Sequence, residues 1–364
     1  MRFKKTAAAA GINMMPNSHS SSECAVEAAV FNGEFWKPCP GTGGGYLCCG
    51  YQILSPQQGC GMYCRYCILQ VYFDRRCRVL FENYSDLERE VARKMAVWRG
   101  VVRFGTGEFT DSLFAEDKTK LSRKIAATLE PYDNAVVEFK TKSANVADLH
   151  EIKRPQRAVI GFSVNTPRVI AMFEKDTASL EERLAAARQC ESMGFHVAFH
   201  FDPIIWYDGW EEEYRSVVRA IYSRVKNPRA IAWCSMGGFR TNPMLKKYLR
   251  TRHEHLPLFS GEMIIGNDGK LRYFRPYRTA LYRTLLDEFE KHDPAVTLYL
   301  CMESPEIWKD CGMAGRIPNG LVNYLDARAE EMCRPGSWKN AARGRKEKGS
   351  TREKQSSFLR LKRR

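Results

Sequence analysis

Residues 59–67 read GCGMYCRYC and place Cys60, Cys64 and Cys67 in the spacing C-x3-C-x2-C. Structural zinc sites and ordinary electron-transfer clusters use four protein ligands. Three closely spaced thiols without an obvious fourth therefore predict a metal site with one position left open for another molecule. The alternative is that Cys77 is the fourth ligand of a zinc site or a plain cluster, although a gap of nine residues after Cys67 is unusual for either.

Strand-like and helix-like segments alternate around these cysteines. The predicted strands are 51–54, 101–108, 134–142, 157–165, 195–203 and 229–237, and the helix-like stretches include 117–129, 179–194 and 210–225. Strand, helix, strand at this spacing predicts βαβ units and a parallel sheet. Because such crossovers are right-handed, six strands should curl into a partial (β/α)6 barrel of the TIM type.

Polar residues stand at the ends of successive predicted strands. They are Gly107 and Glu108, then Lys142, then Ser163 and Asn165, then His200 and Asp202. In a parallel βα barrel these strand ends share one mouth, where the chemistry is done. We expect them to gather beside the cysteine loop, although the pattern favours His200 as a core histidine whose hydrogen bonds are satisfied.

The composition describes a globular chain of 364 residues, 44% apolar and 12% aromatic. No run approaches the roughly 18 apolar residues of a membrane span, and the first residues have too short an apolar core for a signal peptide. Thirteen cysteines in a chain this long do not resemble a secreted disulfide framework. We therefore expect a reducing, cytoplasmic setting and a disordered N-terminus over residues 1–35.

After the N-terminal region, the order of strand-like, helix-like and basic segments predicts three further parts. They are a barrel at 36–240, a C-terminal α+β extension at 241–334 and a basic tail at 335–364. The extension holds a helix-like stretch at 277–292 and AVTLYLCMES at 295–304. Lys339–Arg364 contain 11 Lys or Arg against two Glu, so this segment carries 11 − 2 = +9 of the net charge of +15. We expect a disordered tail that binds a polyanion such as DNA, or that only solubilises the protein.

The cysteine spacing, with Tyr66 directly before the last cysteine, resembles the signature of the radical S-adenosylmethionine (SAM) superfamily. The resemblance implies a 4Fe–4S cluster on Cys60, Cys64 and Cys67 whose fourth iron binds SAM. One electron from the cluster then releases a 5′-deoxyadenosyl radical, so the hard chemistry belongs to the cofactor. It also implies an electron donor such as a flavodoxin or a ferredoxin.

Further segments resemble the spore photoproduct lyase family in order and spacing. They are CRYCILQ (64–70), RFGTGEFTD (103–111), FKTKSANVADL (139–149), FSVNTPRVIAMFEKDTASLEERLAAA (162–187) and DPIIWYDGW (202–210). The similarity covers about residues 39–238, with a weaker likeness in DGKLRYFRP (268–276). It implies a DNA-repair enzyme that uses the deoxyadenosyl radical to reverse a methylene-bridged thymine dimer.

The same resemblance implies the residues that contact SAM. Lys142 would place its ammonium against the SAM carboxylate, and Ser163 would lie beside it. Tyr66 would lie by the adenine, and Thr110 stands where the family has a SAM-contacting serine. The segment GTGEF, with Gly107 and Glu108, resembles the part of many radical SAM enzymes that binds the SAM amino group. Asn165, at the same strand end as Ser163, completes the expected SAM site.

Two departures separate the chain from the lyases. The family cysteine that returns a hydrogen atom to the product radical is absent, because Glu108 or a neighbour stands at its place and no cysteine lies between Cys77 and Cys190. Ile68 stands where the family has a tyrosine. Cys301 and Cys234 are the alternative hydrogen donors, although lone cysteines are commonly just buried. The substrate and the final step are therefore open.

Two other classes of function remain as alternatives: a radical SAM enzyme that acts on a peptide or a small metabolite, and a DNA-binding iron–sulfur protein that cleaves no SAM. Cys39, Cys48 and Cys49 could hold a second metal. We favour a strand-end pair of small buried residues for Cys48 and Cys49, because adjacent strand residues point to opposite faces. The aromatic residues of DPIIWYDGW could stack on a base or pack in the core.

Overall fold

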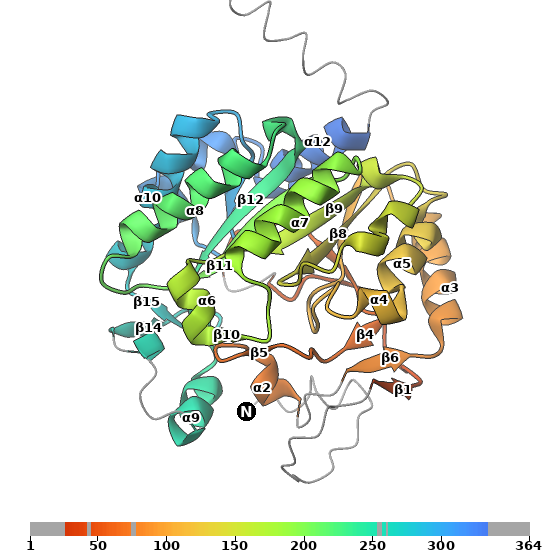
Figure 1. The fold of residues 1–364 in the computed structure, drawn as a ribbon, viewed down its shortest axis with the longest axis horizontal. Coiled ribbons are helices and arrows are strands. Elements are labelled where there is room, and N and C mark those ends of the chain that lie inside the picture. The colour runs from red at the N-terminus through yellow and green to blue at the C-terminus, as the bar shows by residue number, and fades with distance from the viewer. Residues whose placement is uncertain (1–25, 42–44, 74–77, 253–256, 260, 334–364) are drawn as a thin grey trace, which may run out of the picture.

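The computed structural model describes residues 26–41, 45–73, 78–252, 257–259 and 261–333 (Figure 1). The basic tail and Cys77 lie outside these residues. Of the N-terminal region expected to lack structure, residues 26–35 are described, and they include the strand β1 (Glu27–Ala29). This strand pairs in parallel with β6 (Val79–Phe81). The prediction of disorder is therefore wrong for residues 26–35.

One eight-stranded sheet forms the centre of the protein, in the order β16-β12-β11-β9-β8-β7-β3-β2. Its strands are β2 (Trp36–Pro38), β3 (Gln52–Leu54), β7 (Val102–Gly105), β8 (Ala135–Thr141), β9 (Ala158–Ser163), β11 (His196–Ile204), β12 (Ile231–Gly238) and β16 (Leu298–Leu300). All neighbours are parallel except β2 and β3. The six predicted strands are all present, and β2 and β16 extend the sheet at its two edges.

The sheet is curled into a half-barrel. Tyr51, just before β3, makes an edge-to-face contact with Trp233 of β12 at 6.5 Å, although four strands lie between them in the sheet. All six residues of β9 are buried, as expected for a parallel strand covered on both faces. β16 falls in the segment assigned to the extension, yet it pairs in parallel with β12 and completes the barrel sheet.

Helices cover the outside of this sheet. They include α3 (Tyr84–Met95), α4 (Glu116–Thr119), α5 (Leu121–Leu129), α6 (Pro167–Phe173), α7 (Leu180–Ser192) and α8 (Trp210–Arg224), and Figure 1 shows α7 and α8 side by side. A capping box between Ser179 and Glu182 fixes the start of α7. The helix predicted at 117–129 is interrupted, because Lys120 has a left-handed backbone (φ 50°) between α4 and α5.

The cysteine loop lies in a smaller layer at one end of the barrel (Figure 1). It contains β4 (Gln57–Gln58), β5 (Tyr63–Cys64) and α2 (Leu69–Tyr72), and β5 pairs with β10 (Glu174–Lys175). Together with β1 and β6, β4 forms a three-stranded sheet. This layer positions the loop over the ends of the barrel strands.

The C-terminal extension packs on the barrel. It contains β13 (Arg240–Thr241), α9 (Pro243–Arg252), β14 (Met263–Ile265), β15 (Leu271–Tyr273), α10 (Arg275–His292), α11 (Pro305–Asp310) and α12 (Leu321–Cys333). Short 3-10 turns complete the chain at Ala147–Glu151, Pro155–Arg157, Pro228–Ala230, Pro257–Phe259 and Ala314–Arg316. α10, predicted at 277–292, lies against α8. Within the described ranges no helix is both long and apolar enough to cross a membrane.

Candidate cluster and cofactor site

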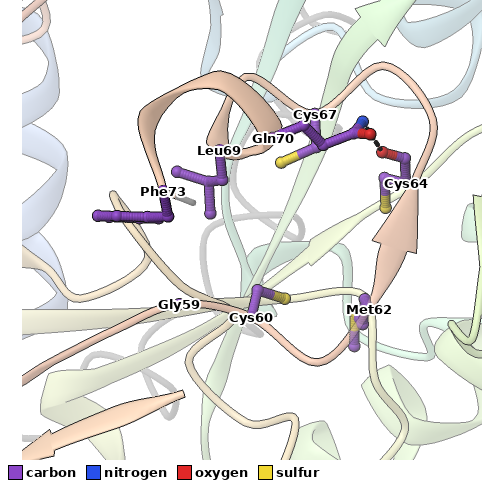
Figure 2. A pocket seen from close by; sticks show the side chains of 8 residues that line it. All are labelled: Gly59, Cys60, Met62, Cys64, Cys67, Leu69, Gln70 and Phe73. Carbon is purple, nitrogen blue, oxygen red and sulfur yellow. Dashed lines mark hydrogen bonds between the residues drawn. The ribbon is translucent and has the colours of Figure 1, made fainter. Parts of the chain in front are cut away.

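The three cysteines of the motif line one pocket. Figure 2 shows their sulfur atoms around a common hollow, together with Gly59, Met62, Leu69, Gln70 and Phe73. The backbone N–H of Cys67 donates to the Cys64 carbonyl at 3.0 Å, and Gln70 Nε2 donates to the same carbonyl at 2.9 Å. The loop is tied to the end of β7 by a bond from the Gly59 N–H to the Phe109 carbonyl at 2.9 Å.

A glycine inside the loop allows close packing. A Cβ at Gly61, between Cys60 and Met62, would collide with the Phe114 ring unless that ring moved. Glycine therefore lets the chain run close to Phe114 next to Cys60.

The donor set fits an iron–sulfur cluster. Burial, with a smaller contribution from Asp111, raises the pKa of Cys60 to about 12, and burial also raises the pKa of Cys64. These thiols are neutral without metal, so iron must displace their protons. Among the described residues no three His, Cys, Asp or Glu side chains converge on a single metal ion. That is compatible with a cubane cluster, because its three cysteines bind separate irons around a shared space.

A buried ionic group stands behind the loop. The Tyr66 hydroxyl donates to Glu174 Oε1, and Arg183 Nη2 lies 2.6 Å from Glu174 Oε2. Lys142 Nζ lies 5.9 Å from the centre of the Tyr66 ring. Burial acts to raise the pKa of Glu174, but Lys142 and Arg183 outweigh it and lower that pKa. Burial acts to lower the pKa of Lys142, but Glu174 and Cys64 raise it, so Lys142 stays a cation.

The structure thus brings Tyr66 and Lys142 together beside the cluster loop, and it adds Glu174, which sequence reasoning missed. The pairing of β5 with β10 sets Glu174 opposite Cys64. Asp111 was also missed. Its Oδ1 accepts from Thr141 Oγ1 at 2.7 Å, and its Oδ2 accepts from the Lys142 N–H at 2.7 Å. Asp111 closes RFGTGEFTD, so the motif contained it without marking it as buried.

Glu108 also lies at this end of the barrel, but it already has a partner. Lys37 Nζ of β2 stands 3.2 Å from Glu108 Oε2 and 4.4 Å from the centre of the Phe109 ring. Burial raises the pKa of Glu108, and Lys37 opposes that rise. A Cβ at Gly107 would lie 3.3 Å from Lys140 Cβ, so glycine lets this segment approach β8 closely.

The other predicted SAM residues are buried. Asn165 uses its side chain in the fold: Nδ2 donates to the Pro203 carbonyl at 2.9 Å, and Oδ1 accepts from the Tyr214 hydroxyl at 2.7 Å. Ser163 is 3% exposed, and its carbonyl accepts from Arg183 Nη1 at 2.9 Å. Thr110 Oγ1 donates to the Asp111 carbonyl at 3.2 Å.

His200 belongs to a polar group inside the barrel. Its Nε2 contacts Glu138 Oε1, its Nδ1 lies 2.6 Å from Ser235 Oγ, and the Tyr51 hydroxyl donates to the other Glu138 oxygen. Both ring nitrogens therefore have partners, as expected for a satisfied core histidine. Glu138 was not singled out by the sequence.

Asp202 and Cys301 lie together at the barrel mouth. Arg240 Nη2 lies 2.9 Å from Asp202 Oδ2 and 3.6 Å from Cys301 Sγ. Burial raises the pKa of Cys301 to about 11, although Arg240 acts to lower it. Cys234 is on β12 next to Ser235, whose side chain reaches the barrel interior, so Cys234 faces the helices on the other side.

Cys48 and Cys49 differ from the strand-end pair that we favoured. They precede β3 in a segment without regular structure, both are half-buried, and the backbone N–H of Gly50 donates to Cys48 Sγ at 3.3 Å. Because Cys48 and Cys49 do not lie in a β-strand, the alternation of side chains between the two faces of a strand does not apply to them.

The aromatic residues of DPIIWYDGW pack together. The Trp206 ring lies 4.9 Å from the Trp210 ring and 4.6 Å from the Tyr277 ring, and the Tyr207 hydroxyl lies 2.7 Å from Thr166 Oγ1. These contacts show that the aromatic side chains pack against one another, which is one of the two expectations for this segment.

Comparison with known proteins identifies the family and the fold of this chain. The family model "Spore photoproduct lyase" matches residues 50–232. Spore photoproduct lyase of Geobacillus sp. (strain Y412MC61) is 30% identical over 159 residues, which cover 43% of this chain and 46% of that protein. The protein of the same name from Clostridium acetobutylicum is 25% identical over 163 residues, covering 44% and 48%. The chain thus spans about half the length of the curated relatives it matches.

Solved structures show the same fold. A spore photoproduct lyase mutant with bound AdoMet and dinucleoside spore photoproduct has a TM-score of 0.63 at 21% identity, covering 68% of this chain and 76% of that chain. Another mutant of that lyase has a TM-score of 0.69 at 19% identity, covering 79% and 87%. The matching family model covers half of the sequence and includes the cysteine loop. The chain belongs to the spore photoproduct lyase family.

Proposed function

We propose that this chain is a radical SAM enzyme that holds a 4Fe–4S cluster on Cys60, Cys64 and Cys67 and acts on a thymine-dimer type lesion in nucleic acid. The observation that carries the proposal is the pocket in which these three thiols meet, with Lys142 and Tyr66 beside it. Three cysteine ligands leave one iron for SAM. A 4Fe–4S cluster held there would supply the one-electron chemistry by which SAM yields a 5′-deoxyadenosyl radical.

The residues around the pocket bind and orient SAM in this proposal. The Lys142 ammonium pairs with the SAM carboxylate, and Glu174 keeps Lys142 charged. Glu108 accepts a charge-assisted hydrogen bond from the SAM amino group. To make this bond, the amino group must displace Lys37 from the Glu108 carboxylate or bind the carboxylate together with Lys37. Tyr66 lies towards the adenine. Gly107, Thr110, Ser163 and Asn165 shape the surrounding strand ends, and Asn165 acts through its hold on Pro203 and Tyr214.

The nature of the substrate rests on the relatives. A solved relative carries a dinucleoside spore photoproduct, and this chain shares its fold and family. The charge of +9 on Lys339–Arg364 supports contact with DNA phosphates. A flavodoxin or a ferredoxin in the cytoplasm would supply the electron.

Cys301 is the proposed source of the returned hydrogen atom. A thiol gives a hydrogen atom to a carbon radical readily because its S–H bond is weak, whereas the carboxyl group of Glu108 does not. Burial keeps the pKa of Cys301 at about 11, so the thiol retains its hydrogen at neutral pH. Cys301 lies at the mouth beside Arg240 and Asp202, while Cys234 faces the helices.

One assay separates this proposal from its alternatives. Reconstituted, reduced protein is incubated with SAM and dinucleoside spore photoproduct, and both 5′-deoxyadenosine and repaired thymine are measured. The proposal predicts both products. Deoxyadenosine without thymine would favour a radical SAM enzyme for a peptide or a metabolite. The absence of both would favour a non-catalytic iron–sulfur protein.

A further inference from the structure

The strand that carries Cys64 has two different faces. β5 pairs with β10 so that Cys64 lies opposite Glu174 and Tyr63 lies opposite Lys175. Cys64 and Glu174 are buried, whereas Tyr63 is 40% exposed and Lys175 is also exposed. Because side chains alternate between the two faces of a strand, one face of this two-stranded ribbon lines the cluster pocket and the other meets solvent.

The buried face of the ribbon belongs to the proposed SAM site. Cys64 lines the pocket of the three cysteines, and Glu174 accepts a hydrogen bond from the Tyr66 hydroxyl. Lys142, which follows β8 of the barrel, lies on the same side, with its Nζ 5.9 Å from the centre of the Tyr66 ring. A molecule that reacts at SAM therefore approaches from the barrel. The exposed face lies behind the cluster loop, and only an electron needs to cross it.

The short helix α2 divides the same two environments. Its residues Leu69 and Gln70 line the pocket, while Tyr72 is 42% exposed. α9 lies against α2, and Figure 1 shows both helices at the end of the barrel that carries the cluster loop. The solvent-exposed surface behind the pocket therefore continues from the ribbon over α2 to α9.

The outward side of α9 is apolar and basic. Met244 is 60% exposed, and Lys247 and Arg250 follow it at intervals of three residues and are exposed too. Residues three apart share one side of a helix. Neither Lys247 nor Arg250 forms an ion pair with any residue that the structure describes. Both charges are thus available to a partner in solution.

We propose that the surface behind the cluster loop is the docking site of an acidic protein that carries single electrons. This carrier face consists of Tyr63, Tyr72, Lys175, Met244, Lys247 and Arg250. Aromatic and methionine side chains are enriched at protein interfaces, and the three cations, which outnumber the exposed carboxylate of Asp176 beside Lys175, would steer an acidic partner. Electron-transfer complexes bury less than roughly 1,200 Å², so a small surface suffices.

The step at the carrier face is the transfer of one electron. The reduced carrier is oxidised by one electron, a cluster on Cys60, Cys64 and Cys67 would be reduced by one, and no covalent bond forms or breaks. This inference rests on the proposed function, because only a redox-active cluster needs a carrier. DNA is a second polyanion, but its lesion must reach SAM from the barrel side, so the face behind the loop fits an acidic protein better.

The test compares reduction by a protein and by a small molecule, in reconstituted protein without SAM. Reduced flavodoxin is mixed anaerobically with the protein, and the loss of visible absorption of the cluster is followed by stopped flow. A variant carrying Lys175→Glu, Lys247→Glu and Arg250→Glu should be reduced at least about tenfold more slowly at low salt. The difference should vanish near 1 M salt, where charges are screened within about 3 Å. Photoreduced deazariboflavin, which is uncharged, should reduce both proteins equally.

A matched control reverses three exposed cations at the other end of the barrel. Lys153, Lys226 and Arg229 precede β9 and β12, so they lie at the ends of these strands away from the cluster loop. The variant carrying Lys153→Glu, Lys226→Glu and Arg229→Glu should be reduced by flavodoxin at the wild-type rate. A second readout needs no electron transfer: carbodiimide should cross-link carboxylates of oxidised flavodoxin to Lys175 or Lys247, as located by peptide mass spectrometry.

The outcomes separate this inference from the proposed function. Reduction of the carrier-face variant at the wild-type rate, or equal slowing of the control variant, would overturn the docking site. Weaker DNA binding by the carrier-face variant with unchanged reduction would assign the surface to DNA and overturn it as well. A wild-type protein that deazariboflavin cannot reduce would lack a redox-active cluster, which removes the proposed function and, with it, the need for a carrier.

Discussion

The hydroxyl group of Tyr66, one residue before the last cysteine of the cluster loop, donates a hydrogen bond to the carboxylate of Glu174. This contact joins the loop to the barrel wall, because Glu174 is also paired with Arg183 at the start of α7. Glu174 further sets the charge of Lys142. One buried carboxylate therefore couples the cluster loop to the proposed SAM site.

Glu174→Gln should destabilise the protein strongly. Glu174 and Arg183 are 1% and 0% exposed, so removal of the negative charge leaves buried cations without compensation. Loss of one partner from a buried ion pair costs about 3–5 kcal/mol of the free energy of unfolding. Urea unfolding of the metal-free protein measures this loss in the free energy of unfolding.

Glu181→Gln is the matched control, since Glu181 and its partner Arg224 are 63% and 47% exposed. This variant should lose less than about 1 kcal/mol of the free energy of unfolding. Equal costs for the two variants would contradict the structural role of Glu174.

The stabilisation from Glu174 should depend on pH in a defined direction. Lys142 and Arg183 outweigh burial and hold its pKa in the folded state below the unfolded value. A group with a depressed folded-state pKa contributes its stabilisation above the unfolded pKa of about 4.3 and loses it as the pH falls through the folded-state pKa. The difference between wild type and Glu174→Gln should therefore be constant between pH 6 and 7 and shrink below about pH 4. A stability difference between the two proteins that grows as the pH falls would show that the folded state does not lower the pKa of Glu174.

Glu108→Gln should weaken SAM binding. If Glu108 accepts a hydrogen bond from the SAM amino group, loss of its charge should cost about 1.5–3 kcal/mol, or roughly one to two orders of magnitude in Kd. Equilibrium binding of SAM to the reconstituted protein measures this. Glu34→Gln, a change at an exposed carboxylate, is the control and should bind SAM as wild type does. Unchanged affinity in the Glu108 variant would remove Glu108 from the SAM site.

Cys301→Ala should change the products and leave SAM cleavage intact. Without its thiol the product radical lacks its hydrogen donor, so repaired thymine should fall while 5′-deoxyadenosine still forms. Cys234→Ala should repair normally, because that thiol faces the helices. Clean repair by the Cys301 variant would show that the hydrogen atom comes from another group.

The barrel strands could be predicted because they are short runs rich in apolar residues, as in β9 and β12, separated by helix-like stretches. The edge strands β2 and β16 have three residues each, too few to show a pattern. Their pairing depends on strands far away in the sequence. The break between α4 and α5 at Lys120 could not be predicted either, because lysine has no preference for the left-handed backbone that it adopts there.

The cluster cysteines and Lys142 could be found by spacing and by position at a strand end. Glu174, Asp111 and Glu138 could not, because an acidic residue in a sequence is usually exposed. Each is buried by partners that only the fold supplies: Arg183 for Glu174, Thr141 for Asp111, and His200 for Glu138.

Deletion of Lys339–Arg364 tests the predicted role of the basic tail. If its cations bind DNA phosphates, the deletion should weaken binding evenly across sequences and flatten the dependence of log K on log salt. Loss of about four phosphate contacts should reduce the slope by roughly 3 to 4 units. An unchanged slope in a salt titration would limit the tail to a solubilising role.

In the proposed site three cysteines, and no fourth, hold a cluster that cleaves SAM. The most direct measurement is iron content and 5′-deoxyadenosine formation in reconstituted, reduced protein carrying Cys→Ala at position 60, 64, 67 or 77. Each of the first three variants should lose both iron and deoxyadenosine, while Cys77→Ala should retain both. Loss of iron from the Cys77 variant would show a four-cysteine site with no open iron for SAM.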